Sequence, residues 1–197
     1  MATSERAGML TRLPSTFRYT DARRLCISDH ALRELRRTGQ IEQIGRGVYR
    51  RADAQLADED LLEIAIKIPD ATLCLGTALA RHDLTDEIPH ELDIALPRDA
   101  WRASVRVPVR YHGFAHSTFG IGRELLPLDD SASIGLYSAE RSIVDAFRLR
   151  HIEGSDLAYE ALRRWVRRGG QPSVLMEIAQ AFPRTMTSLR TALEILL

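Results

Sequence analysis

Cysteine and lysine are both scarce in this chain of 197 residues. The two cysteines, Cys26 and Cys74, lie in different predicted segments and match no metal-ligand spacing, so we expect both to be buried free thiols. Lys67 is the sole lysine, and all the other basic side chains apart from histidine are arginines. The sequence predicts neither a bound metal ion nor a cofactor.

Long apolar runs and biased segments are missing as well. No stretch approaches the ~18 apolar residues of a membrane span, and the N-terminus MATSERAGML has no apolar core for a secretory signal. Hydrophobic residues make up 45% of the chain, which is enough for one large or two small domains. We therefore expect a globular protein of the cytoplasm.

Net charge is zero for the whole chain, but the charges are unevenly distributed. Residues 1–51 carry eleven arginines against five acidic residues, a net charge of +6. Residues 52–150 carry ten basic and seventeen acidic residues, a net charge of −7. A positive N-terminal part suits a polyanion such as DNA, whereas an acidic middle part suits a basic protein partner or a metal ion. The sequence therefore predicts two different partners.

Two capped helices are predicted near the N-terminus. Thr20 is placed to cap a short first helix. Ser28 is placed to cap a second one, because its hydroxyl can accept a hydrogen bond from a backbone N–H two or three residues later. Ile27 and Leu32 are spaced as a hydrophobic staple, and Gly39 stands where a helix ends in left-handed geometry. This pattern is typical of a helix-turn-helix.

The second helix has an apolar face and a basic face. The apolar face consists of Ala31, Leu32 and Leu35. The opposite face carries His30, Arg33 and Arg37. Two β-prone runs follow at 40–44 and 48–51, separated by the predicted hairpin tip Gly45-Arg46-Gly47. A basic helix beside such a wing predicts DNA binding, with the helix in the major groove and Arg46 on the flanking backbone or minor groove. The alternative is a protein-interaction module whose arginines are only solvated.

The rest of the chain predicts a mixed region followed by helices. Residues 52–57 form a polar linker, and a helix follows at 58–68. Further elements are a helix at 77–82 and strands at 72–75, 91–96 and 105–111. We therefore expect an α+β fold, with a winged helix-turn-helix at 1–52 and a mixed α/β domain at 58–197 whose last part, about 138–197, is a helical subdomain.

Three helix starts are predicted in that last part besides the one at Ser138. Ser155 is placed as a cap, while Pro172 and Pro183 suit the first helical position. After Ser138, Arg141 and Asp145 are spaced as a local ion pair worth at most a few tenths of a kcal/mol.

Three segments together carry a family resemblance: ELRRTGQIEQIGRGVYRR, LCLGTALARHDLTDEIPHELDIALPR and IGLYSAERSIVDAFRLR. In this order and spacing they resemble the AbiEi family of antitoxins from bacterial toxin–antitoxin operons, over nearly the whole chain. The resemblance implies a winged helix that represses the operon's own promoter by binding inverted repeats in double-stranded operator DNA, as a homodimer or cooperatively. It also implies a C-terminal domain that neutralises a cognate AbiEii-like nucleotidyltransferase toxin. It places DNA binding on Ser28, His30, Arg33, Arg37 and Arg46.

We expect no catalysis, although two enzymatic alternatives were weighed against a binding protein. Gly76-Thr77 followed by Glu91 and Asp93 is similar to a nucleotidyltransferase signature, in which two carboxylates on one strand face hold Mg²⁺ with substrate phosphates. The sequence lacks two features of that signature, namely a second small residue in the turn and a third acidic residue. The antitoxin could instead modify its toxin by phosphoryl transfer, for which Lys67 is the only lysine. A non-enzymatic alternative is a stand-alone regulator with a ligand-sensing domain.

Overall fold

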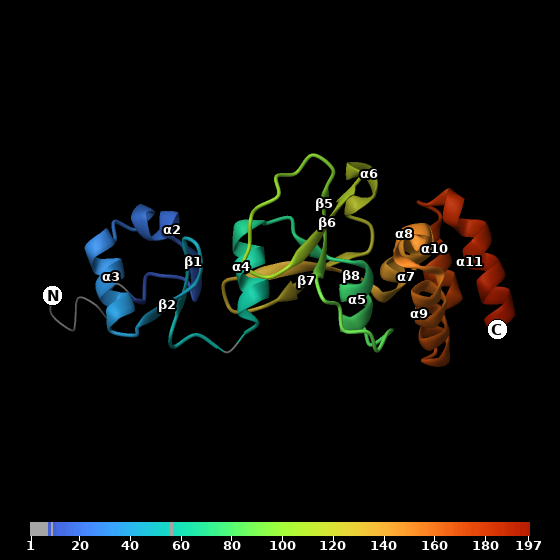
Figure 1. The fold of residues 1–197 in the computed structure, drawn as a ribbon, viewed down its shortest axis with the longest axis horizontal. Helices are drawn as coiled ribbons and strands as arrows, with labels where there is room; N and C mark the ends of the chain where they lie inside the picture. Colours follow the sequence, from blue (N-terminus) through green and yellow to red (C-terminus); the bar gives the residue numbers. More distant parts are fainter. Residues whose placement is uncertain (1–7, 9, 56) are drawn as a thin grey trace. The chain divides into compact units, whose positions relative to one another are not determined.

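The computed structural model describes residues 8, 10–55 and 57–197, and the chain forms two compact units. Unit 1 comprises residues 1–70, 101–107 and 126–134. Unit 2 comprises residues 71–100, 108–125 and 135–197. Both units combine helices with strands (Figure 1), which confirms the predicted α+β class.

Unit 1 contains the winged helix-turn-helix. Helices α2 (Tyr19–Arg24) and α3 (Asp29–Arg37) form the helix-turn-helix, and strands β2 (Ile41–Gly45) and β3 (Val48–Arg51) form the wing (Figure 1). A short strand β1 (Thr16–Arg18), which the sequence did not predict, pairs antiparallel with β3. The sheet therefore has three strands in the order β1-β3-β2.

Local signals place α3 where the sequence predicted it. The Ser28 hydroxyl accepts a hydrogen bond from the Ala31 N–H at 3.2 Å, and Gly39 after the helix has a φ of +70°. Ile27 and Leu32 are both buried in one apolar cluster, as a hydrophobic staple requires.

Two predictions about α2 and the following turn are wrong. The helix begins at Tyr19, one residue before the predicted cap Thr20, because β1 leads directly into it. The carboxylate of Asp21 accepts the N–H of Arg18 at 3.0 Å at this helix start. Cys26 is exposed rather than buried, because it lies in the turn between the helices with a φ of +60°.

Two apolar clusters hold unit 1 together. The first lies between the helix-turn-helix and its sheet and consists of Leu13, Phe17, Ala22, Ile27, Ala31, Leu32, Leu35 and Ile41. The second joins the wing to helix α4 (Glu59–Lys67) and consists of Ile44, Val48 and Leu62, with Ile66, Leu128 and Ala132 packed against them. The wing is therefore packed against α4.

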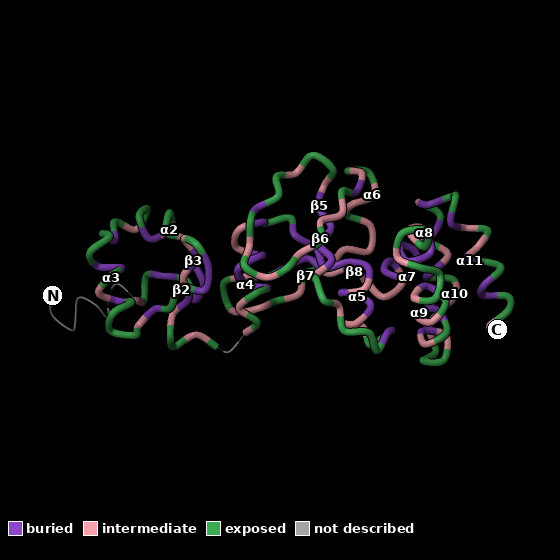
Figure 2. The backbone as a smooth tube through the Cα atoms, viewed as in Figure 1, coloured by how far each residue is buried: buried purple, intermediate pink, exposed green. Residues whose placement is uncertain are grey.

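A mixed five-stranded sheet has the order β6-β5-β4-β8-β7. Its strands are β4 (Thr72–Leu73), β5 (Leu92–Pro97), β6 (Val109–Phe114), β7 (Arg123–Pro127) and β8 (Ser133–Tyr137). Strand β4 pairs antiparallel with β5 and parallel with β8, while β5 pairs parallel with β6. The four central residues of β5 are buried (Figure 2).

The sequence predicted this sheet only in part. Strand β6 begins at Val109 instead of residue 105, directly after Pro108, which has no N–H to donate to a ladder. Strands β7 and β8 were not predicted. Helix α5 (Leu75–Arg81) follows β4, and Cys74 before it is buried as expected. A short helix α6 (His116–Phe119) follows β6.

The last part of unit 2 is helical, as predicted. Its helices are α7 (Ala139–Arg148), α8 (Arg150–Glu153), α9 (Ser155–Arg167), α10 (Pro172–Ala179) and α11 (Pro183–Leu196). Ser155 is the first residue of α9 and not its cap, because Gly154 occupies the cap position with a φ of +90°. Among the helices of the described residues, none is long and apolar enough to cross a membrane.

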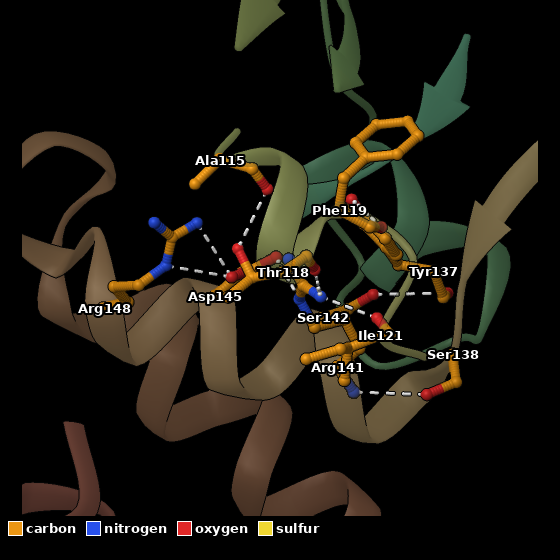
Figure 3. A network of polar contacts seen from close by, with 10 residues as sticks. All are labelled: Ala115, Thr118, Phe119, Ile121, Tyr137, Ser138, Arg141, Ser142, Asp145 and Arg148. Carbon is orange, nitrogen blue, oxygen red and sulfur yellow. Dashed lines mark hydrogen bonds and ion pairs between the residues drawn. The ribbon is translucent and has the colours of Figure 1, made fainter. Parts of the chain in front are cut away.

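A buried arginine ties α7 to the loop after α6 (Figure 3). The Arg141 guanidinium donates to the Asp145 carboxylate at 2.8 Å and to the carbonyl oxygens of Thr118 and Ile121 at 2.7 and 2.6 Å. Ser138 caps α7 by accepting the Arg141 N–H at 3.2 Å. Both charged side chains of the pair are 0% exposed. The predicted ion pair between Arg141 and Asp145 is therefore present, but the sequence did not predict that it is fully buried.

Candidate DNA-binding surface

The exposed side of α3 carries the residues predicted to contact DNA. Its buried side packs Ala31, Leu32 and Leu35 into the core of unit 1. Its exposed side chains are those of Asp29, His30, Arg33, Arg36 and Arg37, and the last four are called here the α3 surface. The apolar and basic faces predicted from the helical wheel therefore lie as expected, although Arg36 was not predicted to take part.

Ser28 and Arg37 already have partners within the protein. Ser28 uses a hydroxyl lone pair to cap α3, which leaves its own O–H available as a donor. Arg37 donates to both oxygens of Glu34, at 3.1 and 2.9 Å, and this hydrogen bond raises the pKa of Arg37. Among the described residues, Arg33 donates only to the carbonyl oxygen of Asp29, at 3.3 Å, and is paired with no carboxylate. A DNA phosphate must therefore compete with Glu34 for Arg37 but not with a paired carboxylate for Arg33.

Arg46 is presented by the turn of the wing. The turn consists of Arg46 and Gly47, with Gly45 paired to Val48 and Gly47 at a φ of +71°. The Gly47 carbonyl accepts the N–H of Tyr19 at 2.8 Å, which fixes the turn against the start of α2. The Arg46 side chain is exposed beside this anchored backbone.

Two shallow grooves in unit 1 meet at Tyr19. One of about 270 Å³ is lined by Tyr19, Asp29, Leu32, Arg33, Arg36 and Tyr49. The other, of about 500 Å³, includes Arg18, Arg46 and Lys67 in its lining, and no acidic side chain borders it. The structure thus brings Ser28, His30, Arg33 and Arg37 onto one helix and places Arg46 in a neighbouring groove.

Sequence reasoning missed the residues that border the α3 groove from other elements. Tyr19 belongs to α2 and Tyr49 to β3, so their position beside α3 depends on how the three elements pack. Arg36 follows Arg33 by three residues, which is one turn along the same helix. That spacing was visible in the sequence and could have identified it.

The carboxylates considered for catalysis lie in unit 2. Glu91 is exposed just before β5, and Asp93 is 3% exposed within it. Both border a cleft of about 610 Å³, with Gly76 of α5 opposite. The N–H of Asp93 donates to the Thr77 hydroxyl at 2.8 Å, which links the small-residue turn to the strand.

Two side chains of β6 hold the Asp93 carboxylate. Arg110 and His112, both on β6, lie 2.8 and 2.9 Å from its Oδ1. Burial by itself would raise the pKa of Asp93, but these hydrogen bonds and the arginine charge outweigh it, so the pKa lies below its ordinary value. Arg110 also contacts Glu153 at 2.6 Å. Among the described residues, no three histidine, cysteine or acidic side chains are grouped so as to hold a metal ion.

Lys67 belongs to unit 1 and is bound there. Its ammonium donates to the buried Glu63 carboxylate at 2.6 Å and to the Ser104 carbonyl oxygen at 3.0 Å. Lys67 is therefore part of a hydrogen-bond network in unit 1, whereas Glu91 and Asp93 belong to unit 2. Catalysis by these three residues stays an alternative to the predicted binding function.

The capped α3, its basic exposed face and the wing form a winged helix-turn-helix, an arrangement typical of DNA-binding regulators. Residues 9–52 match the family model described as "Transcriptional regulator, AbiEi antitoxin". The matched segment covers the winged helix and less than a quarter of the chain. The resemblance to AbiEi antitoxins is thus confirmed for this segment. No match was found among curated proteins.

Proposed function

We propose that this protein is an antitoxin that represses its own promoter through α3 and neutralises a cognate nucleotidyltransferase toxin in the cytoplasm. The observation that carries the proposal is the α3 surface, with three arginines and one histidine exposed on a capped helix inside the segment that matches the AbiEi regulators. A positive helix face suits the major groove of an operator, and neutralising phosphates accounts for much of such affinity.

Specific roles on DNA follow from the contacts within unit 1. Arg33, which is paired with no carboxylate of the described residues, is the main cation of the helix. Ser28 and His30 at its start are placed to donate to phosphates or base edges, while Arg37 contributes less because Glu34 competes for it. Arg46 contacts the flanking backbone. Inverted repeats would bind two copies, as a homodimer or cooperatively.

Toxin neutralisation is assigned to the remainder of the chain. Residues 52–150 carry a net charge of −7, and the cleft beside β5 is bordered by Glu87 and Glu91 and by Asp93 and Glu153, which are paired with Arg110. An acidic surface is complementary to the basic rim that a nucleotidyltransferase needs for nucleotide or RNA. The proposed mechanism is occlusion of the toxin and involves no chemical step.

The test separates the two activities in the full-length protein. The double variant R33A/R36A should lose at least about ten-fold in repression of a reporter behind its own promoter, since two phosphate contacts are removed. It should still rescue growth when co-expressed with the neighbouring toxin gene under an unrelated promoter. R167A, which removes an exposed arginine at the end of α9, is the matched control and should change neither result.

The outcomes distinguish the parts of the proposal. Unchanged repression by a folded R33A/R36A protein would place DNA binding elsewhere. Loss of rescue together with repression would contradict the division of labour between the two activities. Absence of rescue by the wild type would favour a stand-alone regulator over an antitoxin.

A ligand-sensing regulator is the second candidate, and one cavity of unit 2 favours it. The cavity, of about 680 Å³, includes Arg148, Arg150, His151 and Arg184 in its lining and is bordered by no acidic side chain. Such a lining suits an anionic small molecule. This alternative requires that a metabolite anion releases the wild-type protein from its operator, whereas the antitoxin proposal requires that the toxin gene product is bound.

A further inference from the structure

Asp29 is an exposed acidic residue beside the basic side chains of the α3 surface. It is the first residue of α3, and its side chain is 59% exposed. Arg33 and Arg36 border the same groove. An exposed carboxylate at this position repels the phosphates that the neighbouring arginines attract. We therefore expect Asp29 to make a favourable contact with DNA that offsets this repulsion.

The Asp29 carboxylate is held in one orientation by α2. The Tyr19 hydroxyl donates to its Oδ1 at 2.6 Å, and the Arg23 guanidinium lies 3.6 Å from the same oxygen. No described residue is bonded to Oδ2. The hydrogen bond to Asp29 is also the foremost cause of a raised pKa of Tyr19, whose phenol is already a donor at neutral pH. One oxygen is thus anchored and the other is available.

The start of α3 is the part of the helix that approaches base edges. In helix-turn-helix proteins the N-terminal residues of the second helix contact bases in the major groove. Among base edges there, the amino group of cytosine is the usual donor to a carboxylate. An acid at a helix start also interacts favourably with the helix dipole, but that role does not require an anchoring tyrosine from another helix.

We propose that Asp29 reads sequence, by accepting a hydrogen bond from the cytosine amino group at one base pair of each operator half-site. The inference rests on the proposed DNA-binding function and adds its specificity. Arg33 and Arg36 bind the phosphates of any duplex, whereas Asp29 favours duplexes that carry cytosine at one position of the half-site. Tyr19 and Arg23 act as positioning residues, because they hold the carboxylate without touching the base.

The experiment is selection of binding sites from a random duplex library with the full-length protein, followed by affinity measurements on single-base variants of the selected site. Wild-type protein should prefer cytosine at one position of each half-site by about ten-fold, which corresponds to about 1.4 kcal/mol. D29A should lose this preference at that position alone. It should also bind scrambled duplex about two- to five-fold more tightly at low salt, since one repelling charge is removed.

Two further variants separate base reading from a structural effect. D29N should change the preferred base from cytosine to adenine, because an asparagine amide pairs with the N6 and N7 of adenine. Y19F keeps the charge but releases the carboxylate, so it should weaken the cytosine preference without raising affinity for scrambled duplex. D53A is the matched control, since Asp53 is a similarly exposed acid, 64%, elsewhere in unit 1, and should leave the preference unchanged.

Each failure has a distinct signature. If D29A, still folded by thermal melting, keeps the single-position preference, the Asp29 proposal is overturned while the repressor proposal stands. If D29A lowers affinity for every duplex equally, its role is structural and the proposal is likewise overturned. If the wild type selects no sequence and binds no promoter fragment, both proposals fall together.

Discussion

At the scale of single residues, Arg141 and Asp145 of unit 2 form a fully buried pair of charges. The Arg141 guanidinium packs over the rings of Tyr137 and Phe182, at 4.3 and 4.6 Å from their centroids, and pairs with Asp145. Desolvating two charges is costly, and only good geometry and additional hydrogen bonds offset that cost. Here two backbone carbonyls accept hydrogen bonds from Arg141, and two aromatic rings pack against its guanidinium. The pair therefore fixes α7 against α6 and the loop that follows it.

Replacing Arg141 by methionine should therefore be strongly destabilising. R141M leaves the Asp145 carboxylate buried with only the partly exposed Arg148 beside it, and we expect a loss of about 3–5 kcal/mol in the free energy of unfolding. Urea denaturation measures it. The double variant R141M/D145L should recover part of this loss, because it removes the unpaired charge. A loss below about 1 kcal/mol in R141M would show that the pair is not important for stability.

Asp129 gives a residue-scale prediction about pH. Its carboxylate accepts the Thr16 hydroxyl at 2.6 Å and the N–H groups of Ser131 and Ala132 at 2.8 and 2.6 Å. Burial opposes the charged form, but these hydrogen bonds outweigh burial and lower the pKa of Asp129. The stability that it contributes is present above the unfolded-state pKa of about 3.9 and is lost as pH falls through the lower folded-state pKa.

D129N should accordingly be less stable than the wild type by about 1 kcal/mol at pH 7, since the group is partly exposed and solvent screens it. The difference between the two unfolding free energies should remain constant from pH 7 to about 5 and shrink below about pH 4. Chemical denaturation across this pH range provides the comparison. A difference that grows toward low pH would contradict the assigned direction of the pKa shift.

At the scale of elements, local signals were sufficient to predict α3 and the strands of the wing. They were not sufficient to predict β1, which pairs with the wing, or β8, which pairs with β4. A capping serine, a staple and a left-handed glycine are encoded within a dozen residues, so the sequence located Ser28 and Gly39 correctly. Strand β1 has three residues, and its partner β3 lies more than thirty positions later. Strand β8 pairs in parallel with β4 across more than sixty positions. Such pairings depend on tertiary packing and leave no local pattern.

The same distinction applies to the candidate DNA-binding surface. His30, Arg33 and Arg37 share a face of one helix, so helical periodicity predicts them. The role proposed for Asp29 depends on Tyr19, which lies on another helix. A wheel drawn for α3 cannot show that contact, and only the packing of α2 against α3 creates it.

The wing should contribute affinity without specificity. Arg46 is exposed at a turn fixed by the Gly47 carbonyl, where it is placed to reach the backbone. R46A should weaken binding by a similar factor on operator and scrambled duplex, and should reduce the slope of log affinity against log salt by about one. Titrations at several salt concentrations measure both effects. A loss confined to the operator would instead assign Arg46 to base reading in the minor groove.

At the scale of the whole molecule, unit 1 extends well beyond its winged helix. Segment 101–107 is fixed to α4 through the buried Glu63, whose carboxylate accepts the backbone N–H of Arg106 at 3.2 Å and the Lys67 ammonium at 2.6 Å. Segment 126–134 is fixed to β1 through Asp129 and Thr16. Chain segments distant in sequence therefore support the wing. The sequence predicted a domain boundary at residues 52–58. That boundary requires the winged helix to be stable without α4 and the two supporting segments.

Leu62 provides the test, because it is 0% exposed and packs against Ile44 and Val48 of the wing. L62A should cost about 2–5 kcal/mol of unfolding free energy by leaving a cavity. If α4 and the wing open together, hydrogen exchange at β2 and β3 should accelerate by a comparable free energy. The matched control is L189A in the core of unit 2, where the leucine is equally buried, and which should leave exchange at β2 and β3 unchanged. Unaltered exchange in L62A would instead establish residues 1–52 as a domain that is stable without α4.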